Sequence, residues 1–352
     1  MSGPAQIPVV PAPRTSETDG PRKRFGQRDW VSGRTLGLIL FAGVLMIVMS
    51  LISPGFLSAQ TFFSQSRYVA FYVLVALAQA VCLAAGDLNL AVGAVGSLAT
   101  VALGLSMTSL GLPPMAAAFA ALALGPLTGW FQGWIITRLR IDAFIVTLSM
   151  MFVYLGLRSG VSGGNSYPMP PSFWWLGQGS IGGWLPYMAL LVLGVLWIVS
   201  FVYRRTVFGR RLLATGSNPE AARLSGIDTR RMIVAAHVLS GTFSALAAVL
   251  WASWSGNAAP QTGDDWLVIS YAVSIIGGTG LKGNLISPLG ILMGAIIFKL
   301  IQHCLVILRI NDNFSNTLLG ALILLAIVVD RAREHLATPT SARETRPRAE
   351  TK

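Results

Sequence analysis

Long apolar runs alternate with short polar segments along most of this 352-residue chain. Several runs reach the roughly 18 residues that a helix needs to cross a bilayer. A helix satisfies its own backbone hydrogen bonds, which lipid cannot do. We therefore expect an all-α, polytopic integral membrane protein with about ten spans. The expected spans are 35–52, 68–85, 89–108, 115–137, 143–157, 185–203, 232–252, 266–281, 288–308 and 314–330.

The placement of Lys and Arg assigns the loops to the two sides of the membrane. Ten spans put 22 of the 26 basic residues on one side, three on the other, and Lys299 inside a span. Basic residues collect on the cytoplasmic side of membrane proteins. We predict cytoplasmic tails at 1–34 and 331–352, both disordered, a transmembrane domain at 35–330 with a cytoplasmic loop at 204–231, and an external loop at 158–184. The net charge of +12 then reflects the membrane surface and its lipids, and no nucleic acid is expected.

No catalytic or metal-binding pattern is found in the sequence. Cys82 and Cys304 both fall in apolar runs, where a free cysteine behaves as a small buried hydrophobe. The three histidines are scattered, and the chain has no G-x-x-x-x-G-K-[ST] phosphate-binding loop. We expect no enzyme activity, no metal, and no ATP bound by this chain.

Glycines recur every four residues at Gly125, Gly129 and Gly133, and again at Gly290 and Gly294. This spacing aligns them on one face of a helix. Small residues allow neighbouring membrane helices to approach closely. We interpret both stripes as helix-packing surfaces.

One compact polar segment, SNPEAARLSGID at 217–228, interrupts the apolar sequence. Ser217 and Glu220 match a capping box, while Asn218 followed by Pro219 offers an alternative start. Gly226 is suited to the helix end, where the backbone often takes a positive φ. About two turns of helix are predicted, and a helix this short needs a surface to lie on.

The segment EAARLSG within it resembles the E-A-A-x-x-x-G motif of ATP-binding-cassette (ABC) importer permeases. Other segments are similar to the sugar-importer branch of that family, the ribose, xylose and arabinose permeases. They are GDLNLAVGAVGSL (86–98), LGQGSIGG (176–183), GRRLLATGSNPEAARLSGIDTRRM (209–232) and SIIGGTGLKG (274–283).

This resemblance implies a bacterial inner-membrane subunit that imports a small polar solute, most readily a monosaccharide. The implied partners are a cytoplasmic ATP-binding subunit, a second permease chain (the same or a paralogue) and a periplasmic solute-binding protein. Branched-chain amino acids, nucleosides and a sugar-like signal are alternative solutes. An ion-coupled secondary transporter is a further alternative, although central acidic residues are scarce. The residues implied in coupling to the ATPase are Arg210, Arg211, Glu220, Ala221, Ala222 and Gly226.

Polar residues in or near the spans are candidates for the solute path. Asp87 follows a break at Gly86, so it either lines a broken helix or caps the next helix in a tight turn. The sugar branch usually has Asp where this chain has Asn89, and smaller residues where it has Lys282 and Asn284. The candidate path residues are Asp87, Asn89, Gly93, Asn257, Lys299 and His303.

Lys299 and His303 lie four residues apart, so they share one face of a helix. Three interpretations are open for them: a buried polar path, an ion pair with another helix, and a lysine that extends its amine toward the membrane surface.

Overall fold

The computed structural model describes residues 33–53, 56, 58–183, 185–279 and 285–308, together with 317, 320 and 321. Most of the predicted tail 1–34, the tail 331–352 and nearly all of the predicted span 314–330 lie outside these residues. Lys282 and Asn284 lie outside them too.

Helices account for nearly all of the described chain, which confirms the all-α prediction. Each of the first nine predicted spans coincides with a helix. Six of these helices are long and apolar enough to cross a membrane. They and the shorter apolar helices are α1 (Gly33–Ile52), α2 (Ala59–Ala85), α3 (Val92–Thr108), α4 (Pro114–Leu139), α5 (Ala143–Ser162), α7 (Tyr187–Arg205), α10 (Thr229–Ser255), α11 (Trp266–Ile276) and α12 (Pro288–Ile307).

Three boundaries differ clearly from the prediction. The helix α5 ends at Ser162 rather than at 157. The helix α2 begins at Ala59 rather than at 68, because the polar residues before 68 continue the helix from the N-cap Ser58. The helix α11 ends at Ile276 rather than at 281, where Gly277 and Gly278 follow it and Gly278 has a positive φ of 88°.

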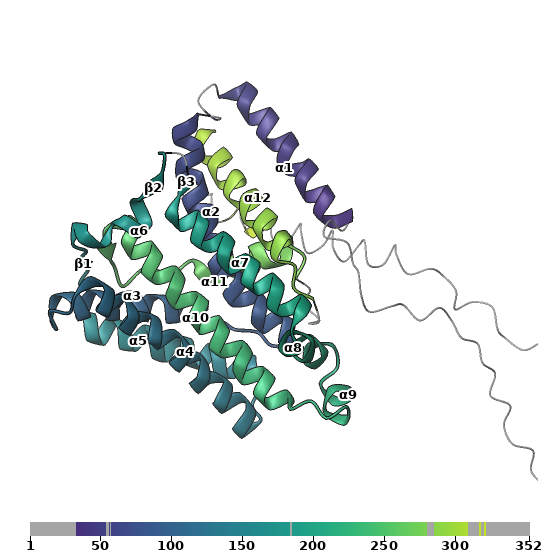
Figure 1. The fold of residues 1–352 in the computed structure, drawn as a ribbon. Helices are drawn as coiled ribbons and strands as arrows, with labels where there is room; N and C mark the ends of the chain where they lie inside the picture. Colours follow the sequence, from purple (N-terminus) through teal and green to yellow (C-terminus); the bar gives the residue numbers. More distant parts are fainter. Residues whose placement is uncertain are drawn as a thin grey trace, which may run out of the picture.

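Short elements lie at the two ends of the bundle (Figure 1). At one end are α8 (Val207–Ser217) and α9 (Pro219–Leu224), beside the start of α10; we call this the basic end. At the opposite end, β1 (Tyr167–Pro168) pairs with β4 (Asn257–Ala258), and β2 (Ser180–Ile181) pairs with β3 (Leu185–Pro186), both antiparallel. The short helices η1 (Pro171–Phe173) and α6 (Trp175–Gln178) also lie at this opposite end.

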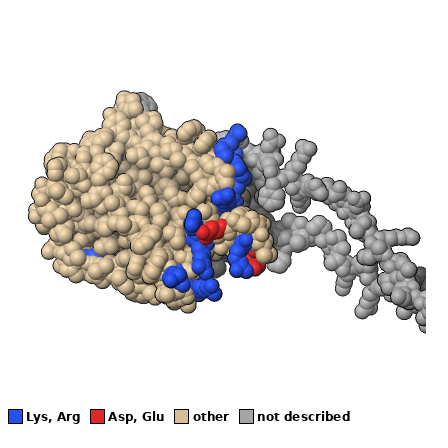
Figure 2. Space-filling view, turned by 60° about the horizontal axis from the view of Figure 1, so that its bottom comes forward, with Lys and Arg blue, Asp and Glu red and all other residues tan. Residues whose placement is uncertain are grey.

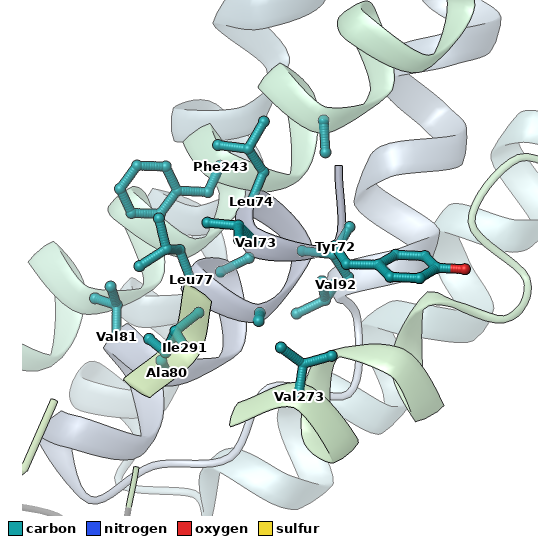
Figure 3. Packing of buried hydrophobic residues seen from close by; sticks show 14 of the residues in the cluster. Tyr72, Val73, Leu74, Leu77, Ala80, Val81, Val92, Phe243, Val273 and Ile291 are labelled. Carbon is teal, nitrogen blue, oxygen red and sulfur yellow. The ribbon is translucent and has the colours of Figure 1, made fainter. Parts of the chain in front are cut away.

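The helix α2 occupies the centre of the bundle. Every residue from Ala70 to Ala85 is buried, so this part of the helix is covered on all sides. It packs against α7, α8, α10, α11 and α12. Figure 3 shows its Val73, Leu74 and Leu77 packed among Phe243 of α10 and Ile291 of α12. A helix that is apolar all round is expected to be buried in this way.

The glycine stripe on α4 lies against α10, as predicted. A Cβ atom added at Gly129 would lie 2.1 Å from the carbonyl oxygen of His237, and one at Gly125 would lie 2.3 Å from that of Gly241. Gly133 meets the backbone of Val234 in the same way. The two helices therefore touch backbone to backbone, which only glycine permits.

The second stripe serves the same purpose between α11 and α12. An added Cβ at Gly290 would lie 1.9 Å from the carbonyl oxygen of Gly277, and one at Gly294 would lie 2.6 Å from that of Val273. The prediction of packing surfaces is confirmed for both stripes.

Replacing Gly129 with alanine tests the α4–α10 contact. We expect Gly129→Ala to destabilise the protein by about 1–3 kcal/mol, since overpacking forces the two backbones apart. The thermal unfolding midpoint of the purified chain in detergent measures this effect. Gly156→Ala is the matched control, because an added Cβ there meets nothing within 4 Å. Equal midpoints for the two variants would contradict the close approach.

Candidate functional site

Basic side chains gather at the basic end of the molecule. Figure 2 shows a band of blue side chains there with a few acidic ones among them, while most of the rest of this face carries neither charge. The exposed arginines on α7, α8, α9 and α10 at this end are Arg204, Arg205, Arg210, Arg211, Arg223, Arg230 and Arg231.

The helix α9 begins at an asparagine cap. The Oδ1 atom of Asn218 accepts a hydrogen bond from the backbone N–H of Ala221 at 3.0 Å, and Pro219 takes the first helical position. Ser217 still belongs to α8, and its hydroxyl donates to the carbonyl of Leu213 at 2.9 Å. The predicted capping box between Ser217 and Glu220 is therefore wrong, and the alternative start at Asn218 is confirmed. Because Ser217 has a helical backbone, its side chain points back along α8.

The end of α9 matches the prediction for Gly226, which has a φ of 79°. The N–H of Gly226 donates to the carbonyl of Arg223, and the N–H of Ile227 donates to that of Ala222, both at 3.0 Å. These bonds satisfy carbonyl groups that a helix end otherwise leaves open. The segment is thus a turn and a half of helix that is capped at both ends.

The helix α9 turns one side inward and leaves the rest exposed. Ala222 is buried, whereas Ala221 and Glu220 are exposed. Glu220 forms an ion pair with Arg223, with 2.7 Å between Oε1 and Nη2. Leu224 is 79% exposed, although it is a large apolar residue. Leu224 was not predicted as a coupling residue, although a single leucine in this polar segment could have indicated an exposed apolar contact.

The end of α8 lies directly on the end of α2. An added Cβ at Gly216 would lie 2.0 Å from the carbonyl oxygen of Ala84. Gly86 terminates α2 with a φ of 89° and lies against Gly216 in turn. The contact between these helices is therefore made by backbone atoms.

An irregular segment, 86–91, follows this contact and separates α2 from α3. Asn89 is buried; its amide donates to the hydroxyl of Ser240 at 2.9 Å, and its Oδ1 accepts from the N–H of Ala91 at 2.9 Å. Leu90 donates its N–H to the Thr147 hydroxyl at 3.2 Å. The backbone is broken here and held by side chains of α5 and α10.

Asp87 does not cap the next helix, so that interpretation of the residue is wrong. The N-cap of α3 is Ala91, and it makes no side-chain cap bond. The Oδ2 atom of Asp87 lies 3.5 Å from Nε2 of the buried His237. The Nδ1 atom of the same ring lies 3.9 Å from the Cys82 sulfur. Asp87 thus faces the packed interior between α2 and α10, close to the basic end.

A cavity of about 220 Å³ lies at the opposite end of the bundle. Aromatic rings from α2, α10 and α11 form part of its wall, and the loop before α11 supplies polar groups. Concave sites of this kind, with apolar walls and a few polar groups, are typical of small-molecule binding. Its lining residues are Phe71, Tyr72, Trp251, Gln261, Thr262, Gly263, Asp265 and Trp266.

Burial raises the pKa of the Asp265 carboxyl above its usual range, and the neighbouring carboxylate of Asp264 raises it further, against a backbone hydrogen bond that lowers it. Asp264 points elsewhere, because it forms an ion pair with Arg158 at 2.6 Å. Two adjacent carboxylates therefore have different surroundings, and only Asp265 lines the cavity.

Gly93 supports the cavity from behind. An added Cβ at Gly93 would lie 2.1 Å from the carbonyl oxygen of Gly263, and one at Gly96 would lie 2.3 Å from the Trp266 ring. Gly263 itself has a φ of 99°. The close approach of α3 to the loop therefore sets the position of Gly263 and Trp266 in the wall. Gly93, a predicted path residue, thus packs against the wall of this cavity without lining it.

The remaining predicted path residues are not among those that line the cavity. Asn257 belongs to the short ladder between β1 and β4. The amine of Lys299 lies 3.9 Å from the centre of the Tyr68 ring, so among the described residues it meets an aromatic face rather than a carboxylate. His303 lies 3.0 Å from the Gln65 amide and stacks on Phe56. Lys299 and His303 thus connect α12 to α2 and the segment before it.

The residues of the cavity wall could not be predicted from their spacing along the sequence. The wall joins residues of α2 to residues 251–266, which lie far away in the chain, and Phe71, Tyr72, Trp251 and Trp266 resemble ordinary residues of apolar spans. The one feature of the sequence that could have indicated them is the concentration of aromatic residues near the end of α10 and the start of α11.

Comparison with known proteins places these features in a family. Residues 61–327 match the family described as branched-chain amino acid transport system / permease component. The ribose import permease protein of Bacillus subtilis (strain 168) is 30% identical over 301 residues, which cover 85% of this chain and 93% of the relative. The fructose import permease protein of Rhizobium meliloti is 28% identical, over 82% and 84%. The autoinducer 2 import system permease protein of Yersinia pestis (strain Pestoides F) is 29% identical, over 85% of each chain.

Replacing the asparagine cap tests the structure of α9. Loss of such a cap costs about 1 kcal/mol, so we expect Asn218→Ala to increase amide hydrogen exchange of 219–225 by about fivefold. Hydrogen exchange with mass spectrometry measures this in the purified chain. Ser217→Ala is the matched control, and its exchange in 219–225 is expected to be unchanged. The reverse pattern would restore the capping box.

Proposed function

Because the chain belongs to the branched-chain amino acid transport system / permease component family, we propose that it is the membrane-spanning subunit of an ATP-driven (ABC) importer of a sugar or sugar-like solute. It is a polytopic permease and a transport component rather than an enzyme. The observation that carries the proposal is α9, a short, capped helix that is mostly exposed at the basic end.

The proposed partner of α9 is a separate cytoplasmic ATPase subunit, which binds the ATP. The proposal puts the basic end in the cytoplasm, in agreement with the preference of basic residues for that side. An interface of this size concentrates its energy in a few contacts. Leu224 offers an exposed apolar anchor, and Glu220 offers a charge beside it. Ala222 is buried and would hold α9 against the rest of the protein. Arg210 and Arg211 are exposed on the preceding helix, α8.

The proposed solute is a monosaccharide or a close analogue. Relatives of this chain are named for the import of ribose, fructose and autoinducer 2. A sugar presents hydroxyl groups that need hydrogen-bond partners and ring faces that pack on aromatic side chains. The cavity supplies both through Asp265, Gln261 and three aromatic walls at Phe71, Trp251 and Trp266.

An amino acid is a poorer match for this cavity than a sugar. Its carboxylate would need a basic partner inside the site, since a buried charge is costly unless it is paired. Among the residues that the structure describes, those lining the cavity include the acid Asp265 and no Lys, Arg or His. This observation supports the sugar alternative over branched-chain amino acids.

The proposed path leads from the cavity along α3 toward the broken segment 86–91. Gly93 lies behind the cavity wall, and Asn89 precedes it by four residues at the broken backbone. Irregular backbone inside a membrane protein is tolerated where it faces a cavity or other protein. A periplasmic binding protein would deliver the solute at the opposite end, and a second permease chain would complete the path.

Two substitutions in α9 test the coupling proposal. We expect Glu220→Arg and Gly226→Val each to reduce solute uptake to background while the chain still accumulates in the membrane. The first reverses a charge on the exposed face, and the second places a β-branched residue at a φ of 79°. Co-purification of the ATPase with tagged permease, measured alongside uptake, is expected to fall by at least tenfold.

Ser217→Ala is the control for these variants, with uptake and ATPase capture expected at wild-type levels. Normal ATPase capture by both test variants would remove α9 from the interface. Solute uptake that needs no ATPase would instead favour a secondary transporter.

Neighbouring carboxylates allow a matched test of the cavity. A hydrogen bond to a charged group contributes about 1.5–3 kcal/mol, so Asp265→Asn is expected to lower sugar uptake by tenfold or more at subsaturating solute. Asp264→Asn, which removes a charge from the ion pair with Arg158, is expected to retain uptake. Uptake of labelled sugars into vesicles that contain the complete transporter provides the measurement. Equal losses in both variants would contradict a role specific to the cavity.

A further inference from the structure

A second, larger hollow lies near the basic end, between α7, α8 and α10. This cleft has a volume of about 730 Å³ and opens to the surface. Its lining residues are Val202, Phe208, Asp228, Arg230, Arg231, Val234, Ala235, Val238 and Leu239.

The inner part of the cleft is apolar and follows the axis of α10. Val234, Ala235, Val238 and Leu239 share one face of the helix and are only half-buried. Arg230 and Leu239 are separated by nine residue steps on α10, which corresponds to a rise of about 14 Å at 1.5 Å per residue. That length, from the arginine mouth to the inner end of the cleft, is about half of a hydrocarbon core of roughly 30 Å. The apolar slot, from Val234 to Leu239, makes up about half of this rise and has room for the upper part of an acyl chain.

The mouth of the cleft carries positive charge. Arg230 is exposed, and the side chain of Arg231 is 84% exposed. The ion pair of Arg231 with Asp228 uses Nε, at 2.9 Å from Oδ2. The planar guanidinium group binds phosphate through parallel hydrogen bonds. With the basic end in the cytoplasm, as proposed above, this mouth faces the side of the bilayer where basic pockets bind anionic headgroups.

We propose that this cleft is a binding site for one anionic phospholipid of the cytoplasmic leaflet. Arg230 and Arg231 hold its phosphate, and an acyl chain lies along Val234, Ala235 and Leu239. The site rests on the proposed orientation, with the basic end in the cytoplasm. Basic pockets between membrane helices on that side are suited to anionic headgroups, because basic residues near the surface attract anionic lipids.

The shape and charge of the cleft favour lipid over protein as the occupant. The apolar slot lies along a membrane-spanning helix, where a cytoplasmic ATPase cannot follow it. In a two-fold symmetric contact through this face, a second copy would present its own arginines to the same region, and like charges would oppose each other.

Native mass spectrometry of the full chain, without the ATPase, tests the site. The chain is reconstituted in phosphatidylcholine nanodiscs with or without phosphatidylglycerol, and the lipid that stays bound after extraction is counted. We expect one retained phosphatidylglycerol, and at least tenfold less in Arg230→Ala/Arg231→Ala. The control Arg205→Ala/Arg210→Ala removes the same charge from residues that do not line the cleft, and is expected to retain the lipid.

A second variant tests the apolar slot while both arginines remain. Ala235→Trp fills the slot, and we expect it to lose the retained phosphatidylglycerol with an unchanged elution volume in size-exclusion chromatography. Equal lipid loss in the cleft and control double variants would overturn the proposal in favour of general surface attraction. Displacement of the lipid by millimolar glycerol 3-phosphate would overturn it in favour of a free phosphate site.

Two further outcomes would assign the cleft to a protein. A loss of ATPase capture confined to Arg230→Ala/Arg231→Ala would give this surface to the ATPase, and crosslinks between copies through a cysteine at 235 would give it to a second permease chain. Because the lipid measurement uses the permease alone, its failure would leave the coupling proposal standing.

Discussion

The complete burial of α2 is the constraint on which the arrangement of the other helices depends. From Ala70 to Ala85 this helix has no exposed residue, because it is covered by the surrounding helices α3, α7, α8, α10, α11 and α12. The water around a soluble protein would drive this packing, but lipid does so only weakly, and close contact has to supply the energy. The residues that meet α2 and its neighbours are accordingly small or interlocking, as the glycine stripes of α4 and α12 show. The helices α1 and α5 lie at the edge of the bundle (Figure 1).

This arrangement places a basic surface and an aromatic cavity at opposite ends of the helix bundle. Exposed arginines, α8 and α9 lie at one end, and the aromatic cavity with Asp265 lies at the other. The helix α10 joins both, since Arg230 belongs to its first turn and Trp251 to its last two turns. The same helix also holds the broken segment through Ser240 and His237, about midway between the ends. A single rigid element thus contacts the basic end, the interior break and the cavity.

Much of the fold was predictable, because it depends on local pattern. Apolar runs gave the spans, the four-residue glycine spacing gave the packing faces, and Gly226 gave the end of α9. The start of α2 was missed because Gln65, Ser66 and Arg67 make that turn look like a loop, whereas the structure places it within the helix. The local sequence pattern also could not decide whether Ser217 or Asn218 caps α9, because the answer depends on where the preceding helix α8 ends.

The candidate site was less accessible than the fold. Coupling residues were named through a short motif that lies in one continuous segment, so a linear pattern was sufficient to find them. The cavity brings together α2, α10 and the loop before α11, and the spacing of residues along the sequence does not predict this contact. Lys299 was selected for its charge in an apolar run, yet its amine meets the ring of Tyr68. A polar residue in a span indicates that a partner exists but not which partner it is.

The contact of Gly216 with Ala84 has a mechanical consequence. Most helix contacts are cushioned by side chains, whose rotamers can change when one helix shifts by a fraction of an ångström. Here backbone meets backbone, with no intervening side chain that can rotate out of the way. The joint between α8 and the end of α2 is therefore stiff in compression. A push on α8 toward the bundle therefore reaches the backbone of α2 directly, without first being taken up by a change of rotamer.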